Sequence, residues 1–90
     1  METRVAMISI VVENQESVEK LNQILHEYSP YIIGRMGLPY PKRNISLISV
    51  TVDAPADKIS AMTGKIGMLK GITSKALFAR LQEESSEKTD

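Results

Sequence analysis

The sequence predicts an α+β domain in which four strands form one antiparallel sheet and two helices cover one face of that sheet. Four segments are rich in β-branched and aliphatic residues, and two others carry apolar residues at intervals of three and four. Their order is β-α-β-β-α-β, which is that of the ferredoxin-like sandwich. Both βαβ connections are expected to be right-handed, so both helices should lie on the same face.

Length and composition indicate one small domain without a cofactor. The chain has 90 residues, enough for a single modest core, and its 11 basic and 11 acidic residues leave no net charge to attract nucleic acid or a membrane. The absence of cysteine excludes disulfides, thiol catalysis and cysteine-bound metal clusters. The longest apolar run, residues 5–12, is too short to span a bilayer, and no signal peptide is recognisable, so we expect a cytoplasmic protein.

The first strand is expected over residues 1–12 and the first helix over residues 14–28. Alternation along this strand leaves aliphatic side chains on both of its faces. Asn14 can cap the helix, and the apolar stripe that follows comprises Val18, Leu21, Ile24, Leu25 and Tyr28. Ser29-Pro30 should end it, because the residue before a proline avoids the helical region.

The second and third strands are expected over residues 31–38 and 45–52, joined by a polar connection over residues 39–44. Gly34 and Gly37 weaken the second strand. In the third strand the apolar pattern changes phase between Leu47 and Ile48, which a bulge or burial of both faces would explain.

A second helix should follow Asp53-Ala54-Pro55, with Asp53 as its cap and an apolar stripe formed by Ile59, Met62, Ile66 and Leu69. Gly64 and Gly67 inside it cost about 1 kcal/mol each relative to alanine, which indicates close backbone approach or early termination. Gly71 is expected to end this helical segment, and residues 72–79 are expected to form the fourth strand. We expect residues 1–79 to form the single domain and the polar residues 80–90 to be a disordered tail.

The predicted sheet has one face that the helices cannot cover. The first and third strands, which are central in this fold, carry aliphatic residues on both sides. Exposed apolar surface of this extent usually marks an interface, so we expect a homo-oligomer, a dimer or a tetramer, that buries the open face, an edge strand or both. The alternative is a surface with scattered aliphatic side chains.

Several segments together resemble one known family. They are METRVAMISIVVEN at the start, GRMGLPY at residues 34–40, ISLISVTVDAP at 45–55 and ISAMTGKIGMLKGITSKALF at 59–78. With these segments the chain resembles the iron-only hydrogenase system regulators of anaerobic bacteria, a family similar to ACT-type regulatory domains and to the C-terminal domain of the nickel-responsive repressor. The resemblance implies a ferredoxin-like, ACT-like oligomer associated with the hydrogenase system. It covers about residues 1–79.

The sequence departs from the nickel repressor at its metal site. That repressor binds nickel through histidines and a cysteine, whereas this chain has no cysteine and only one histidine, His26. A nickel site of that kind is therefore not carried over, and we expect no metal. His26 is interpreted as a surface or interface residue, with symmetric histidines across an oligomer axis as the alternative. No ribbon-helix-helix DNA-binding segment is expected before the first strand.

Three places are candidate ligand contacts. In GRMGLPY, Gly34 and Gly37 can let backbone N–H groups approach an anion while Arg35 supplies charge, with Met36 and Tyr40 beside them. The alternative is a bulge and a turn shaped by Pro39. Thr63, Gly64 and Lys65 lie in TGKIG, which lacks the first glycine and the serine or threonine of a P-loop, so nucleotide hydrolysis is not expected.

Close helix packing and ligand contact at an oligomer interface are the two interpretations of TGKIG. Asn14 is the third candidate, because ACT-type domains often hold effectors at the loop after the first strand, against a neighbouring subunit. Its alternative role is that of a helix cap.

The predicted function is that of a non-catalytic regulatory module that senses a small molecule or binds a partner. No nucleophile–base constellation is recognisable, which argues against an enzyme. The alternatives are an interaction scaffold without effector and a metal-responsive transcription regulator. RNA-recognition modules of this fold stack bases on aromatic residues in the central strands, and the first and third strands here contain none.

Overall fold

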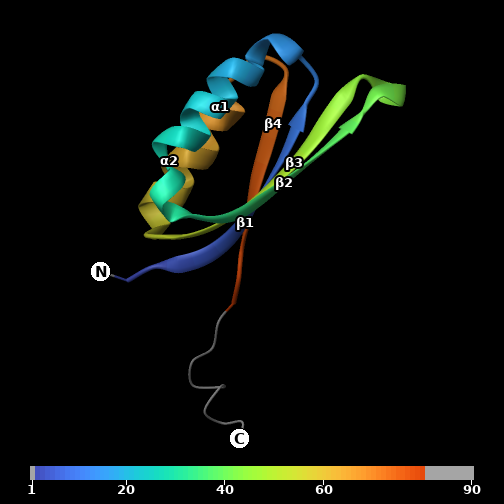
Figure 1. Ribbon diagram of the computed structural model, residues 1–90. Helices are drawn as coiled ribbons and strands as arrows, with labels where there is room; N and C mark the ends of the chain where they lie inside the picture. The colour runs from blue at the N-terminus through green and yellow to red at the C-terminus, as the bar shows by residue number, and fades with distance from the viewer. Residues whose placement is uncertain (1, 81–90) are drawn as a thin grey trace, which may run out of the picture.

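The computed structural model describes residues 2–80 and confirms the predicted ferredoxin-like, ACT-like fold (Figure 1). The strands are β1 (Arg4–Val12), β2 (Ile32–Tyr40), β3 (Ile45–Ala54) and β4 (Ile72–Phe78), and the helices are α1 (Val18–Glu27) and α2 (Ala56–Gly67). Three short 3-10 turns complete the chain: η1 (Gln15–Ser17), η2 (Ser29–Tyr31) and η3 (Pro41–Arg43). Beyond Arg80, the predicted tail lies outside the described residues.

The four strands form one antiparallel sheet in the order β2-β3-β1-β4. Both helices lie on the same side of this sheet, and the hairpin of β2 and β3 extends beyond them (Figure 1). We refer to the side that faces the helices as the helix side and to the other as the open face. β1 and β3 are the central strands, as expected, which leaves β2 and β4 as edges.

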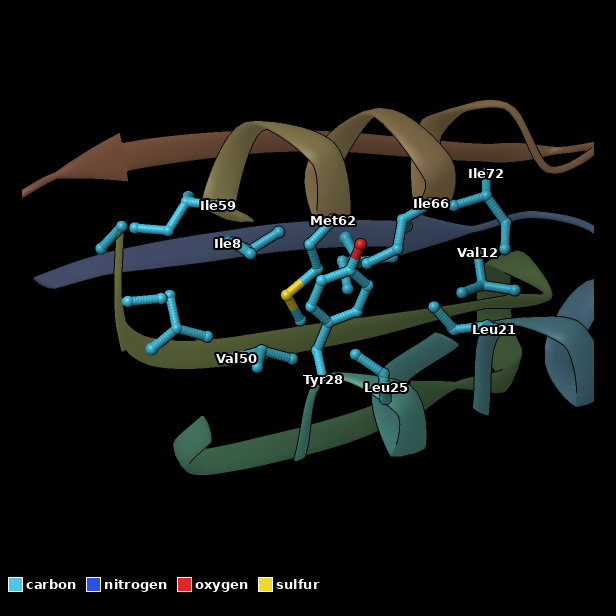
Figure 2. Close-up of a cluster of buried hydrophobic side chains, with 14 residues drawn as sticks. Ile8, Val12, Leu21, Leu25, Tyr28, Val50, Ile59, Met62, Ile66 and Ile72 are labelled. Atoms are coloured by element: carbon cyan, nitrogen blue, oxygen red, sulfur yellow. The ribbon is translucent and has the colours of Figure 1, made fainter. Parts of the chain in front are cut away.

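The core lies between the sheet and the two helices (Figure 2). Alternate residues of β1 point into it, and each is almost completely buried: Ala6, Ile8, Ile10 and Val12. From the helices come Leu21, Leu25, Ile59, Met62 and Ile66, all members of the two predicted apolar stripes. The predicted helical faces therefore match the faces that pack, because a stripe at 3.6-residue spacing can be buried against one sheet face.

The phase change in β3 is not caused by a bulge in that strand. β1 and β3 pair without interruption from Arg4 opposite Ala54 to Val12 opposite Ser46. Ile48 pairs with Ile10 on the helix side, and Leu47 pairs with Val11 on the open face. The change of phase thus marks two apolar faces of a regular strand, one of them uncovered in this chain.

Two predicted boundaries near β3 are wrong. β2 continues to Tyr40, so the predicted polar connection shrinks to η3 and Asn44, which has a left-handed φ of 58°. β3 continues through Asp53, which pairs with Val5 and makes no cap hydrogen bond to α2. Pro55 takes the N-cap position instead, and its carbonyl accepts hydrogen bonds from the N–H groups of Lys58 and Ile59. Hydrogen-bonded pairing with β1 extends β3 through Asp53, although an aspartate just before a helix would by itself favour a helix cap.

Candidate functional site

The GRMGLPY segment is not a loop, because all of it lies within the edge strand β2. Strand alternation divides its side chains between the two sides of the sheet. Gly34, Met36, Leu38 and Tyr40 pair with open-face residues of β3, whereas Arg35, Gly37 and Pro39 pair with helix-side residues. The ligand role of this segment stays a prediction, and the residues named for it belong to two different surfaces.

A β-bulge near the start of β2 sets this division. Ile32 pairs with Val52 and Gly34 pairs with the adjacent Thr51, so Ile33 is an extra residue in the ladder. In a regular strand, two residues three positions apart point to opposite faces. The bulge instead places Ile32 and Arg35 on the same helix side. The bulge expected at Gly34 and Gly37 occurs just before them.

The open face has a shallow apolar hollow of about 300 Å³. Three antiparallel strands contribute to it, and its lining includes the side chains of Ser9, Val11, Met36, Leu38, Leu47 and Ser49. Leu38, Leu47 and Val11 form one continuous row across β2, β3 and β1. Such a row offers a continuous apolar contact surface at the edge of the molecule.

Exposed hydrophobic side chains concentrate on this face. Eight large hydrophobic residues between residues 2 and 80 are exposed, and six of them lie on the open face: Met7, Met36, Leu38, Tyr40, Leu47 and Leu77. The other two are the bulge residue Ile33 and Met68, which follows α2. This uneven distribution differs from the singly scattered hydrophobic side chains that are normal on a protein surface.

On the helix side, a more polar groove of about 390 Å³ runs between α1 and β2. It is lined by Asn22, Leu25, His26, Ser29, Ile32 and Arg35. The Arg35 Nη2 atom donates a long hydrogen bond of 3.4 Å to Asn22 Oδ1. Of the predicted ligand residues, only Arg35 lines this groove.

The groove residues of α1 and η2 were not predicted as a site, although their spacing in the sequence places them on one helical face. Positions 22, 25, 26 and 29 follow the i, i+3, i+4, i+7 spacing of one helical face. Leu25 belongs to the apolar stripe, and its polar neighbours border that stripe. The partner strand could not be identified from this spacing, because the spacing does not show which strand lies beside that face.

Thr63, Gly64 and Lys65 lie on α2 and do not form a loop around a ligand. The Thr63 hydroxyl donates to the Ile59 carbonyl at 2.8 Å, and the Thr63 carbonyl accepts from the Ser74 hydroxyl at 2.8 Å. A β-carbon on Gly64 would have no neighbour within 4 Å, so close packing does not explain this glycine. At Gly67 a β-carbon would lie 3.1 Å from Ser74 Oγ, which fits the predicted close approach.

Lys65 joins the two helices. Its Nζ lies 3.2 Å from Glu27 Oε2 and 5.2 Å from the centre of the Tyr28 ring. The interaction with the Tyr28 side chain, followed by that with Glu27, raises the pKa of Lys65 above 10.5. Within residues 2–80, no hydrogen bond or ion pair links the Thr63–Lys65 segment to Arg35.

Asn14 acts as the predicted cap. Its Oδ1 accepts a hydrogen bond of 2.9 Å from the Glu16 N–H at the start of η1. The neighbouring Glu13 N–H donates to the Gly71 carbonyl at 2.7 Å, and the buried Ser17 hydroxyl donates to the Lys70 carbonyl at 2.7 Å. These contacts fasten the loop after β1 to the turn before β4, which gives Asn14 a structural role.

Between residues 2 and 80, no group of three or more metal-ligating side chains is placed to hold an ion. In the same range, no helix is long and apolar enough to cross a membrane. The central strands β1 and β3 carry no aromatic side chain on the open face, where an RNA-recognition module would stack bases.

Comparisons with known proteins agree with this architecture. Residues 4–76 match the model of the TM1266-like family, described as "Iron-only hydrogenase system regulator, putative". The solved structure of the uncharacterized protein TM1266 from Thermotoga maritima is similar, with 29% sequence identity and a TM-score of 0.84 over 88% of this chain and 100% of that chain. None of the curated proteins matches the sequence.

A second solved structure supports the fold alone. The ACT domain from the GTP pyrophosphokinase of Chlorobium tepidum has a TM-score of 0.69 and 19% sequence identity, over 90% of this chain and 92% of that domain. The chain is thus similar both to an uncharacterized protein and to a domain of the ACT type.

Proposed function

Because this chain belongs to the TM1266-like family of iron-only hydrogenase system regulators, we propose that it is a non-catalytic regulatory module that works as a homo-oligomer. In this proposal, a small molecule binds to the oligomer and changes its assembly or its contacts with a partner. The family match and the ACT-like fold support a regulatory role.

The concentration of exposed hydrophobic side chains on the open face carries the oligomer proposal. A second copy of the chain is the occupant that supplies a matching surface, because a two-fold interface brings the same patch together from both subunits. Charged side chains are depleted in the cores of interfaces. The row formed by Leu38, Leu47 and Val11 has no charged member, and on β1 the open-face residues are Val5, Met7, Ser9 and Val11.

Three hydroxyl groups take part in structural hydrogen bonds, which argues against these three as nucleophiles. In the part of the chain that the structure describes, the Ser17, Thr63 and Ser74 hydroxyls each donate to a backbone carbonyl. A hydroxyl nucleophile would instead donate to a general base. These three groups therefore stabilise the fold, with Ser17 and Ser74 linking different elements, and are not arranged for attack on a substrate.

Light scattering and native mass spectrometry of the full chain test the oligomer. We expect more than one subunit at micromolar concentration. Leu47→Glu should weaken assembly by at least about a hundredfold, because an unpaired carboxylate would be buried in the interface. Met68→Glu is the matched control, since Met68 is 86% exposed but lies outside the open face. A monomeric wild type, or a Leu47→Glu variant that assembles normally, would contradict the proposal.

The same mass spectra test whether the oligomer holds an effector. Protein expressed under anaerobic conditions and purified gently should retain added mass if a small molecule occupies it. A bare oligomer would favour the interaction scaffold, and the search would then turn to its protein partner.

A further inference from the structure

We propose that the groove between α1 and β2 binds the anionic group of a small organic molecule, a carboxylate or a phosphate, with Arg35 as its charge partner. This inference rests on the regulatory function proposed above and names the chemical class of the effector. Four features support it: the direction of Arg35, its lack of a carboxylate partner, the polarity of the lining and the open surface beyond the groove at Gly37.

The bulge at Ile33 directs Arg35 into the groove. Ile32 is half-buried on the helix side, and three residues later a regular strand would point to the open face. The extra residue shifts the ladder, so Arg35 pairs with Val50, whose side chain lies in the core. Bulges frequently re-aim a side chain beside a functional site. Without this bulge, the guanidinium would lie among the exposed hydrophobic residues of the open face.

Arg35 has no carboxylate partner in the described part of the chain. Its contact with Asn22 Oδ1 is long, at 3.4 Å, and the one ion pair between residues 2 and 80 joins Lys65 to Glu27. A guanidinium presents five N–H donors in a fork that matches carboxylate and phosphate oxygens. Most of these donors are therefore free to receive an anion.

The rest of the lining is suited to an organic anion. Asn22, His26 and Ser29 provide polar side chains, and none of the lining residues is acidic. Leu25 is buried and Ile32 is half-buried, so the groove also has an apolar floor. Its volume of about 390 Å³ falls within the range of small-molecule sites. Oriented donors over an apolar floor favour a small molecule with one charged end.

Beyond the groove lining, the helix side of β2 stays open at Gly37. It is the next helix-side residue after Arg35, and a β-carbon built there would meet only the Ile48 side chain, at 4.0 Å. The apolar part of a ligand can extend in this direction while its anionic group contacts Arg35. Because Met36 and Leu38 of the same strand face the open side, a ligand held by β2 would be coupled to the proposed subunit interface.

Nuclear magnetic resonance titrations of the full chain test the groove directly. The probes are sodium benzoate and sodium phosphate, added at constant ionic strength that is maintained with sodium chloride. We expect saturable shifts at the amides of Ser29, Ile32 and Arg35 with at least one probe. A response to benzoate alone identifies a carboxylate ligand, and a response to phosphate alone identifies a phosphate. Shifts that do not saturate with either probe, or that spread over the surface lysines, would overturn the proposal.

Variants separate the role of Arg35 from general charge. Arg35→Gln should weaken binding at least tenfold, and Arg35→Lys should weaken it partially because the charge remains without the fork. Arg43→Gln is the matched control, since Arg43 is an exposed arginine of η3 on the same hairpin. Unchanged affinity in a folded Arg35→Gln variant, or an equal loss in Arg43→Gln, would contradict the assignment.

Light scattering on the same samples separates this inference from the proposed function. An oligomer that binds neither probe would refute the groove and leave the proposed assembly intact. A monomer with saturable binding that depends on Arg35 would support the groove and contradict the assembly.

Discussion

Gly71 lies so close to Asn14 that a β-carbon at Gly71 would be 2.5 Å from the β-carbon of Asn14. The same atom would lie 3.1 Å from the Asn14 backbone nitrogen, and Gly71 has a left-handed φ of 70°. Its carbonyl accepts the hydrogen bond from the Glu13 N–H. Glycine is therefore required at this turn, both for its conformation and for the close approach of the loop after β1.

Replacement of Gly71 by alanine should destabilise the protein. We expect Gly71→Ala to lower the free energy of unfolding by about 2 kcal/mol or more, because the strained φ and the overlap with Asn14 add together. Urea unfolding followed by circular dichroism measures this change. Gly34→Ala is the matched control, since a β-carbon there has no neighbour within 4 Å and φ is not left-handed. An equal stability of the two variants would show that the loop moves without cost.

Replacement of Gly64 by alanine should have the opposite effect. Gly64 lies inside α2, and a β-carbon there meets no atom within 4 Å. We expect Gly64→Ala to raise the free energy of unfolding by about 0.5–1 kcal/mol, the usual gain in a helix interior. The measurement is again urea unfolding, repeated at several protein concentrations. A loss of stability that grows with concentration would instead indicate that another subunit approaches Gly64 in the oligomer.

The contacts of Lys65 should contribute to stability in a pH-dependent way. Its pKa is raised above 10.5 by Tyr28 and then Glu27, so the folded state favours the charged amine. The contribution is therefore complete below pH 10.5 and is lost as pH rises through the higher pKa of the folded state. We expect Lys65→Met to lower Tm slightly at pH 8, and the difference from the wild type to shrink above pH 10.5.

Calorimetry in low and high salt checks the origin of this effect. Lys65 and Glu27 are both well exposed, so 1 M sodium chloride should screen most of the difference. Lys58→Met, on the exposed surface of the same helix, serves as control. A Tm difference that persists at high salt and at high pH would show that the lysine acts through the packing of its aliphatic stem.

Local patterns in the sequence predicted the elements and their buried faces. The apolar stripes of α1 and α2 were correct because each lies within one segment, and burial against a sheet follows from its spacing. Asn14 was correctly predicted to cap, since the hydrogen bond it accepts comes from Glu16, two residues away. The apolar character of both faces of β1 was also predicted from the sequence, because successive side chains of a strand point to opposite faces.

The surroundings of the candidate site residues depend on contacts between distant segments, which the sequence does not show. Arg35 was singled out for its chemistry, but its groove partners Asn22 and Ser29 were not, because they belong to another element. Gly34 and Gly37 were expected near the end of the second strand, and only pairing with β3 shows that they lie on opposite faces of it. For Lys65 both helix packing and ligand contact were considered, and its contact with Glu27, which is distant in sequence, could not be predicted from local spacing.

By itself, the sequence determined the order of the elements, the helix faces that pack and the excess of apolar residues on the central strands. The tertiary structure decided which surface each residue of GRMGLPY occupies, because one bulge opposite Val52 and Thr51 changes the phase of the whole edge strand. Periodicity and capping act between residues a few positions apart, whereas register is set by pairing between strands that are distant along the chain. The direction of Arg35 toward α1 is a consequence of that pairing.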